Sequence, residues 1–496
     1  MQVKPSKEEF SKLAKQGNIV AVAAEVSTDL DTPVSIYYKL VGEEKGFMLE
    51  SATINQQFGR FSFIGTEPLA EIDVFKGRIV IKGDGGNTVI PGSPVDALKV
   101  YLARFDTAAQ EAVLPLMNGG AVGYFNYEVV STFDRIRGLD VADDQILGQF
   151  MICRIMIVVD HFKNTSQIVC LAEVGADSSA GEVYEAARQK IMAVKARLQQ
   201  TVQPAPVVPK RGEKLDFQKK YGQVTPEFLE MIRRGKEYIT AGDAFQIVLS
   251  EQFRCQVTQP AFNFYRRLRQ VNPSAYMFYL NFGSKKLIGA SPEMLVKISG
   301  DMVYTYPIAG SRRRGATAAE DEVLAAELCA DTKECAEHAM LVDLSRNDVG
   351  RISYPGTVKV QKMMQVEKFS HIMHLVSEVC GQVRKEYTAL DVLRACFPAG
   401  TLSGAPKLRA MEIIQELEGK ERNAYAGTVG YLDFSGNMDM CITIRTMRLE
   451  GKEAFVQAGA GIVADSVAET EYKEALQKAG ALFQVIEEVE NNDLIA

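Results

Sequence analysis

The sequence has no tryptophan, only four histidines and no Cys-x-x-Cys pair among its eight cysteines. Single cysteines in apolar surroundings are typical of buried, reduced thiols in a cytoplasmic protein, and neither a disulfide scaffold nor a zinc site fits them. No apolar run approaches the ~20 residues that span a membrane. The polar N-terminus also lacks the apolar core of a signal peptide. We therefore expect a cytoplasmic protein with no membrane contact.

The chain also has no excess of positive charge. Its 56 Lys and Arg residues face 63 Asp and Glu residues, a net charge of −7, which argues against a nucleic-acid surface. With 496 residues, 47% hydrophobic and 24% charged, it has the composition of a soluble globular protein large enough for more than one domain.

One proline-rich segment divides the chain. Residues 199–213 read QQTVQPAPVVPKRGE, a composition that indicates a linker or a long surface connection. We predict an N-terminal region over 1–198, a linker over 199–214 and a second region over 215–496.

The predicted elements favour an α+β fold, with a large antiparallel-sheet core flanked by helices. Several strands follow one another with no helix between them, which disfavours a doubly wound parallel sheet. Thr225-Pro226-Glu227 has the pattern of a helix start. Predicted strands cover 78–82, 119–125, 151–160, 245–249, 276–280, 302–306, 427–434, 441–446 and 454–458; predicted helices lie at 180–199 and near 318–340, 388–396, 405–417 and 466–489.

Near the C-terminus an apolar strand runs into Gly459-Ala460-Gly461, with an acidic helix after it. We predict a glycine turn there, whose N–H groups would bind an anion. A dinucleotide fingerprint, Gly459-x-Gly461-x-x-Ala464, is a weaker interpretation because only 32 residues follow Ala464. A third interpretation is a tight turn with no binding role, followed by glutamates exposed to solvent.

Two acidic helices are candidate cation ligands. The last helix places Glu474 and Lys478 four residues apart with Glu471 on the same side, and the segment 327–343 carries Asp331, Glu334, Glu337, His338 and Asp343. Carboxylates from two helices suit Mg²⁺, although surface ion pairs explain most such patterns.

Three further segments carry candidate polar groups. Residues 310–315 (GSRRRG) suggest either an anion-binding loop or a basic surface loop, and 398–407 (PAGTLSGAPK) is a small-residue turn before a helix. His371 and His374, three apart in a predicted strand, would lie on opposite faces. No Gly-x-Ser-x-Gly nucleophile motif is present. From the residues alone we expect an enzyme that binds a dianionic substrate with a divalent cation.

Read together, ordered motifs along almost the whole chain resemble component I of anthranilate synthase, within the chorismate-utilising enzymes. The motifs are LES (49–51), GRFSFIG (59–65), GDAFQ (242–246), NPSAYM (272–277), SPE (291–293), PIAGS (307–311), DLSRND (343–348), MHL (373–375), GAPK (404–407) and QAGAG (457–461).

The resemblance implies conversion of chorismate and ammonia to anthranilate and pyruvate with Mg²⁺ held by Glu337 and Glu474. It implies that Glu293 is the general acid that protonates the departing C4 hydroxyl, and that His374 orients the ring. The catalytic set also includes Gln246 and Thr401. The substrate carboxylates would be held by Gly310, Ser311, Tyr425, Arg445, Gly459, Ala460, Gly461 and Lys478.

Two positions distinguish members of the family. Isochorismate synthases carry a lysine base where this chain has Gln246, and aminodeoxychorismate synthases commonly carry a lysine where it has Ala309. Both positions favour anthranilate synthase, with those two activities as alternatives. A non-catalytic tryptophan-sensing homologue is the alternative of another class.

The resemblance also implies two protein-level properties. No amide-hydrolysing machinery is visible, so a glutamine amidotransferase subunit would supply the ammonia. The family's tryptophan feedback site is matched by Ser51, Asn272, Tyr276 and Met277, but Ala275 replaces the usual proline. Because alanine does not fix φ as proline does, we expect weakened inhibition.

Overall fold

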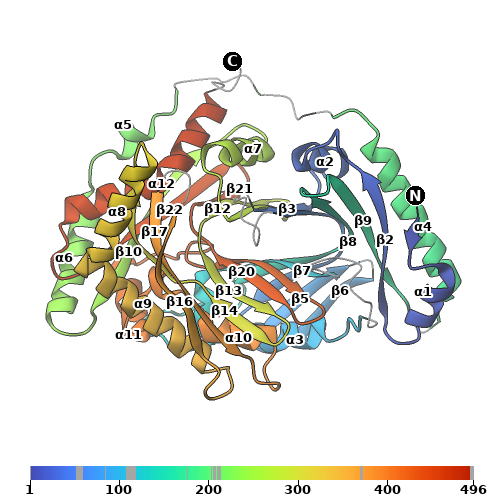
Figure 1. The fold of residues 1–496 in the computed structure, drawn as a ribbon, viewed down its shortest axis with the longest axis horizontal. Coiled ribbons are helices and arrows are strands. Elements are labelled where there is room, and N and C mark those ends of the chain that lie inside the picture. The colour runs from blue at the N-terminus through green and yellow to red at the C-terminus, as the bar shows by residue number, and fades with distance from the viewer. Residues whose placement is uncertain are drawn as a thin grey trace.

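The fold is that of a computed structural model, shown in Figure 1. The structure describes residues 2–51, 60–83, 85–107, 119–175, 177–202, 204, 208, 214–368 and 372–491. Antiparallel strands form its centre, and helices gather at two sides. In Figure 1 helices α6, α8, α9, α11 and α12 lie around β10, β17 and β22, whereas α1, α2 and α4 lie near β2 and β9.

The first part of the chain is mostly β-structure with short helices. Its elements are β1 (Val3–Lys4), α1 (Lys7–Leu13), β2 (Ile19–Ser27), α2 (Pro33–Leu40), β3 (Gly46–Glu50), β4 (Phe61–Phe75), β5 (Arg78–Gly83), β6 (Gly86–Pro91), α3 (Pro94–Leu102), β7 (Gly120–Phe125), the 3₁₀ helix η1 (Tyr127–Thr132), β8 (Gly148–Asp160), β9 (Thr165–Glu173) and α4 (Ala180–Leu198).

The second part carries the longer helices. Its elements are α5 (Phe217–Tyr221), α6 (Pro226–Thr240), β10 (Gln246–Gln256), α7 (Ala261–Val271), β11 (Tyr276–Asn281), β12 (Lys285–Ser291), β13 (Met294–Ser299), β14 (Met302–Thr305), β15 (Ile308–Arg313), α8 (Ala318–Ala330), α9 (Thr332–Gly350), β16 (Lys359–Lys368), β17 (Ile372–Gln382), α10 (Ala389–Cys396), η2 (Gly400–Leu402), β18 (Gly404–Ala405), α11 (Lys407–Glu418), β19 (Thr428–Asp433), β20 (Met438–Ile442), β21 (Thr446–Glu450), β22 (Glu453–Ile462) and α12 (Ala468–Glu490).

Strands from both parts pair with each other. β3 pairs antiparallel with β11, and β7 pairs antiparallel with β19, so the sheets and the two largest apolar clusters draw on both sides of the linker. The division into 1–198, 199–214 and 215–496 stays a prediction, and most of the linker lies outside the described residues. No helix in the described part of the chain is long and apolar enough to cross a membrane.

The α+β prediction is confirmed, and several boundaries follow from local chemistry. The Thr225 hydroxyl accepts from Phe228 N–H, and Pro226 occupies the first turn of α6, as expected from the sequence. The predicted helix near 318–340 is two helices, because Asp331 ends α8 and caps the N-terminus of α9. The predicted strand 441–446 is also wrong: β20 ends at Ile442 and β21 begins at Thr446.

Candidate active site

The glycine motif lies inside strand β22, so the predicted turn at 459–461 is wrong, and the pyrophosphate interpretation falls with it. Gly461 is opposite Val248 of β10, and Gly459 is opposite Ser250. Val248 N–H donates to Ser403 O (2.9 Å) and Ser250 N–H to Glu418 Oε1 (2.8 Å), so both point away from β22.

The two glycines therefore also direct their N–H groups away from β10, because opposite residues of an antiparallel ladder either both face each other or both face away. The neighbouring strand on that side is β21. Within the described part of the chain its pairing with β22 covers residues 453–456 and does not reach Gly459 or Gly461. The Gly459 carbonyl accepts from Lys478 Nζ there (3.0 Å). The strand thus offers two N–H donors on one edge, as an anion site requires.

Close packing explains why these positions are glycine. A Cβ atom on Gly459 would lie 2.3 Å from Leu249 O, and one on Gly461 would lie 2.4 Å from Gln246 Nε2. Gln246 begins β10, and its Nε2 donates to Glu337 Oε1 of α9 (3.2 Å). The glycine strand, the glutamine and a candidate metal ligand therefore meet at one place.

We predict that Gly461→Ala lowers kcat/KM by about 10- to 100-fold, because the methyl group must displace Gln246 from Glu337 and a misplacement of ~1 Å can cost ~10²-fold. Steady-state kinetics with chorismate would measure this. Gly480→Ala in α12 is the control, since its Cβ would meet nothing within 4 Å. Equal kinetics for both variants would contradict the packing argument.

The acidic groups come from facing segments of α9 and α12. Lys333 at the start of α9 pairs with Asp465 just before α12 (3.1 Å). Glu474 accepts from Lys478 (2.6 Å), and both are partly exposed. Burial raises the pKa of Glu334, and the negative charge of Glu337 raises it further. Burial likewise raises the pKa of Glu471, with Glu474 acting in the same direction.

This donor set fits a hard divalent cation, because all the groups are carboxylates, and the charges of Glu337 and Glu474 raise the pKa values of Glu334 and Glu471 respectively. Within the described residues, no three His, Cys, Asp or Glu side chains are grouped to hold a metal. Magnesium does not need such a cage, since it keeps waters and binds substrate oxygens. Glu334 and Glu471 were named from the sequence among the acidic groups of these helices, and each lies one turn before a predicted ligand.

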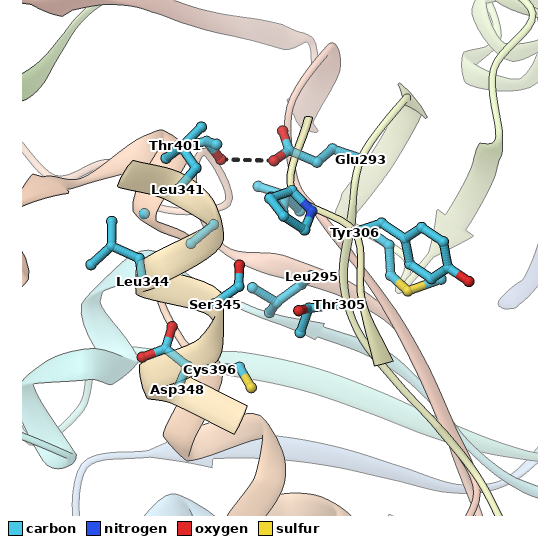
Figure 2. A pocket seen from close by; sticks show the side chains of 15 residues that line it. Glu293, Leu295, Thr305, Tyr306, Leu341, Leu344, Ser345, Asp348, Cys396 and Thr401 are labelled. Atoms are coloured by element: carbon cyan, nitrogen blue, oxygen red, sulfur yellow. Dashed lines mark hydrogen bonds between the residues drawn. The ribbon is translucent and has the colours of Figure 1, made fainter. Parts of the chain in front are cut away.

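Glu293 lies between β12 and β13 with its carboxyl group buried. Thr401, in the 3₁₀ turn η2, donates to Glu293 Oε1 (2.9 Å), and Figure 2 shows the two side chains facing each other. Burial raises the pKa of Glu293 to about 7, against the opposing effects of Thr401, Arg445 and Lys478. A carboxyl group with this pKa is partly protonated near neutral pH, as a general acid must be.

Arg445 stands in the break between β20 and β21 with φ of 50°, and its carbonyl accepts from Ala290 N–H (3.1 Å). Burial lowers the pKa of Arg445, while Tyr425, Glu293 and Glu474 raise it. Three predicted site residues thus lie close enough to act on the charge of its guanidinium. A buried guanidinium of this kind is a bidentate site for a substrate carboxylate.

A buried ion pair supports several of these groups. Arg422 binds Glu418 through two nitrogens and also donates to Leu402 O and Val248 O, each at 2.7 Å. Its guanidinium lies 5.5 Å from the Tyr425 ring. Arg422 therefore joins the turn that carries Thr401, the strand that begins at Gln246, and Tyr425. Its four-residue spacing from Glu418 resembles an ordinary surface pair, which is why sequence reasoning missed it.

His374 on β17 is opposite Ser311 on β15, and its Nδ1 is 2.8 Å from Gly310 O. Burial lowers the pKa of His374, so the ring is neutral at pH 7. Gly310 adopts φ of 68° at a bulge between Ala309 and Ser311. The loop predicted at 310–315 is thus mostly strand.

Other predicted candidates serve structural contacts. Lys407 pairs with Asp348 (2.8 Å), and His338 turns to Ser377 (2.6 Å). Asp331 caps α9 and pairs with Arg312 (2.7 Å). Arg314 binds Asp321, and Asp343 pairs with Arg346 on the surface. His371 lies outside the described residues.

The predicted tryptophan-site residues gather where β3 meets β11. Glu50 is the register partner of Met277, so Ser51 follows beside Tyr276. Asn272 ends α7, and the short segment from it to Tyr276 contains Ala275. The Tyr276 hydroxyl donates to Asp439 (2.9 Å). These five residues are brought together, and their binding role stays a prediction.

Comparison with known proteins agrees with this geometry. Residues 47–484 match the sequence profile of a family described as chorismate binding enzyme. Anthranilate synthase component 1 of Acetivibrio thermocellus is 41% identical over 98% of both chains, and that of Aquifex aeolicus is 41% identical over 99% of both. The chain belongs to the chorismate-binding enzymes, as an anthranilate synthase component 1.

Solved structures of the family share the fold. A crystal structure of anthranilate synthase component I from Streptococcus pneumoniae superposes with a TM-score of 0.71 at 36% identity, covering 92% of this chain and 98% of that one. A menaquinone-specific isochorismate synthase from Escherichia coli has a TM-score of 0.72 at 17% identity, covering 96% and 98%. The second likeness shows the fold alone.

Proposed function

We propose that this anthranilate synthase component 1 converts chorismate and ammonia to anthranilate and pyruvate with Mg²⁺. The observation that carries the proposal is the pairing of buried Glu293 with Thr401, near Arg445 and the edge of β22 that carries the Gly459 and Gly461 N–H groups. This arrangement combines an acid for a departing hydroxyl with donors for carboxylates. The two curated relatives described above, both named anthranilate synthase component 1, favour this activity over the isochorismate and aminodeoxychorismate alternatives.

The substrate carboxylates would be held by groups of opposite charge or by N–H donors. Arg445 takes one carboxylate, and Tyr425, whose electrostatic effect raises the pKa of Arg445, would act beside it. Gly459 and Gly461 N–H groups, with Lys478, take the other carboxylate. Gly310, Ser311 and Ala460 complete the substrate-binding set.

Glu337 and Glu474 would hold Mg²⁺ between α9 and α12. When bound, the ion would neutralise a substrate carboxylate beside two acidic side chains. Lys478, which pairs with Glu474, would then be free to bind the substrate.

Glu293 donates its proton to the C4 hydroxyl as the C4–O bond breaks, so that the group leaves as water. Thr401 holds Oε1 and leaves Oε2 to carry that proton. Gln246 has no basic group, which suits ammonia, a nucleophile that needs no base. Neutral His374, fixed by the Gly310 carbonyl, orients the ring and assists the later loss of pyruvate.

Incubation with chorismate, Mg²⁺ and ammonium tests the proposal. Anthranilate, identified by fluorescence and mass, should form with an equal amount of pyruvate. Isochorismate, or an aminated intermediate without pyruvate, would show that another reaction of the family takes place. Bound chorismate that is never converted would favour a non-catalytic homologue.

A glutamine amidotransferase subunit would supply ammonia in the cell. We expect that the chain alone uses ammonium but not glutamine, and that an added amidotransferase subunit confers glutamine-dependent activity. Glutamine use by the isolated chain would contradict this division of labour.

Tryptophan would bind beside Ser51, Asn272, Ala275, Tyr276 and Met277 and inhibit the enzyme. We predict that Ala275→Pro lowers the tryptophan concentration for half-inhibition, because proline fixes φ and adds a ring beside the site. Activity titrated with tryptophan, before and after the substitution, measures the change. Unchanged inhibition would refute the role given to Ala275.

A further inference from the structure

A polar cavity lies behind Glu293, along one face of α9. Its volume is about 40 Å³, counted as space for the centres of water-sized molecules, which is room for about three waters at ~10–15 Å³ each. Leu295, Leu341 and Leu344 form apolar walls. The polar side chains that line it include Glu293, Thr305, Ser345, Asp348 and Thr401, and Tyr306 and Cys396 also border it.

These polar groups form a sequence from one end of the cavity to the other. Figure 2 shows Ser345 projecting from α9 toward the strand that carries Thr305, below the Glu293–Thr401 pair. Asp348 lies one helical turn beyond Ser345 and binds Lys407 (2.8 Å). Thr305 is 95% buried, yet its hydroxyl oxygen has no hydrogen-bond partner within the described part of the protein. A buried hydroxyl without a partner is costly unless a water binds it.

We propose that this cavity holds a chain of waters through which Glu293 regains its proton from the Asp348–Lys407 end. The proposal rests on the proposed function, in which Glu293 is the acid. After Glu293 has protonated the C4 oxygen and water has left, its carboxylate takes a proton from the nearest cavity water. That water takes one from the next, by way of the Ser345 and Thr305 hydroxyls, and solvent at the Asp348 end supplies the last.

The position of the cavity favours a proton path over an ammonia path. Gln246 lies beside Glu337 and Gly461 on the β10–β22 side, and in the proposed function ammonia attacks the substrate on that side. The cavity instead lies between Glu293 and α9, on the side of the leaving group. A proton supplied there reaches the acid while substrate still covers the other side.

Thr305→Val tests the relay, because valine has nearly the same shape but no hydroxyl. Reprotonation follows water loss, so kcat should fall about tenfold while kcat/KM for chorismate stays unchanged; this loss is smaller than the ~10²–10⁴ that a general acid itself contributes. The solvent deuterium isotope effect on kcat should rise. Thr305→Ser keeps the hydroxyl and should behave as the parent does.

Ser345→Ala gives an independent test from α9, should Thr305→Val fold poorly, and should show the same pattern. An unchanged kcat in both variants, with Thr305→Val more stable to heat, would show a dry cavity and overturn the relay. An equal fall in kcat and kcat/KM would show a structural effect only and would also overturn it. Failure of the parent protein to form anthranilate would instead reject the proposed function.

Discussion

Glu293→Gln is expected to lower kcat by about 10²- to 10⁴-fold, because glutamine keeps the shape and the Thr401 hydrogen bond but carries no acidic proton. KM for chorismate should change little, since the proposed carboxylate site is formed by Arg445 and the β22 edge. Anthranilate fluorescence under saturating ammonium measures the loss. A variant with more than about a tenth of parental kcat would remove Glu293 from the role of general acid.

In the parent enzyme, the titration of Glu293 should be visible in the pH dependence of kcat/KM. Burial raises the pKa of Glu293 to about 7, so the acid form is lost as pH rises through that value, and kcat/KM should fall above it. Each measurement needs the same concentration of free ammonia, because ammonium also loses its proton as pH rises. The falling limb should be absent from the residual activity of Glu293→Gln.

Glu490→Gln is the matched control for this substitution. Glu490 is also buried and hydrogen-bonded, accepting from Thr258 and Gln259 N–H groups (2.7 and 2.9 Å), but it lies at the end of α12. We expect lower stability with parental kcat. A similar loss of turnover in both variants would mean that Glu293→Gln acts through the fold.

Glu474→Gln should lower activity by about 100-fold or more at low Mg²⁺ and raise the Mg²⁺ concentration for half-maximal activity, because the site loses one of its two anionic ligands. Calorimetric titration with Mg²⁺, in the presence of the product anthranilate, measures the affinity for Mg²⁺ without turnover. Removal of Mg²⁺ by a chelator should inactivate the parent enzyme.

Glu469→Gln, one and a half turns earlier on α12, is the control, because Glu469 is exposed. It should keep parental Mg²⁺ dependence. If Glu474→Gln also kept the parental Mg²⁺ dependence, the assignment of Glu474 as a ligand would be wrong. The role of Glu474 would then be the ion pair with Lys478 alone.

Local patterns predicted the elements that local chemistry determines. The Thr225 cap and the helix near 466–489 depend on residues within a few positions of each other, and both were predicted. The family resemblance supplied the site residues, and in the structure Glu293, Tyr425 and Glu474 lie close enough to Arg445 to raise the pKa of its guanidinium.

The predictions were wrong where contacts with strands distant in the sequence determine the backbone conformation. Gly459-Ala460-Gly461 has the composition of a turn, but pairing with β10 makes it a strand whose glycines are needed for close approach. Arg445 looks like part of a β-branched run, yet the chain breaks there with φ of 50°. Arg422 gave no local signal, since its partners Leu402 and Val248 are 20 and 174 residues away.

The pairing of β11 with both β3 and β12 has a thermodynamic consequence. Tyr276, in the proposed tryptophan site, is the register partner of Ser291, which lies two residues before Glu293. Ser291 Oγ in turn donates to Ile442 O (2.6 Å), and Ile442 N–H donates to Glu293 O (3.0 Å). One strand pair therefore separates the effector from the acid. Because coupling between two sites is reciprocal, the proposed inhibition, if tryptophan acts by weakening chorismate binding, requires that chorismate weaken tryptophan binding by the same factor.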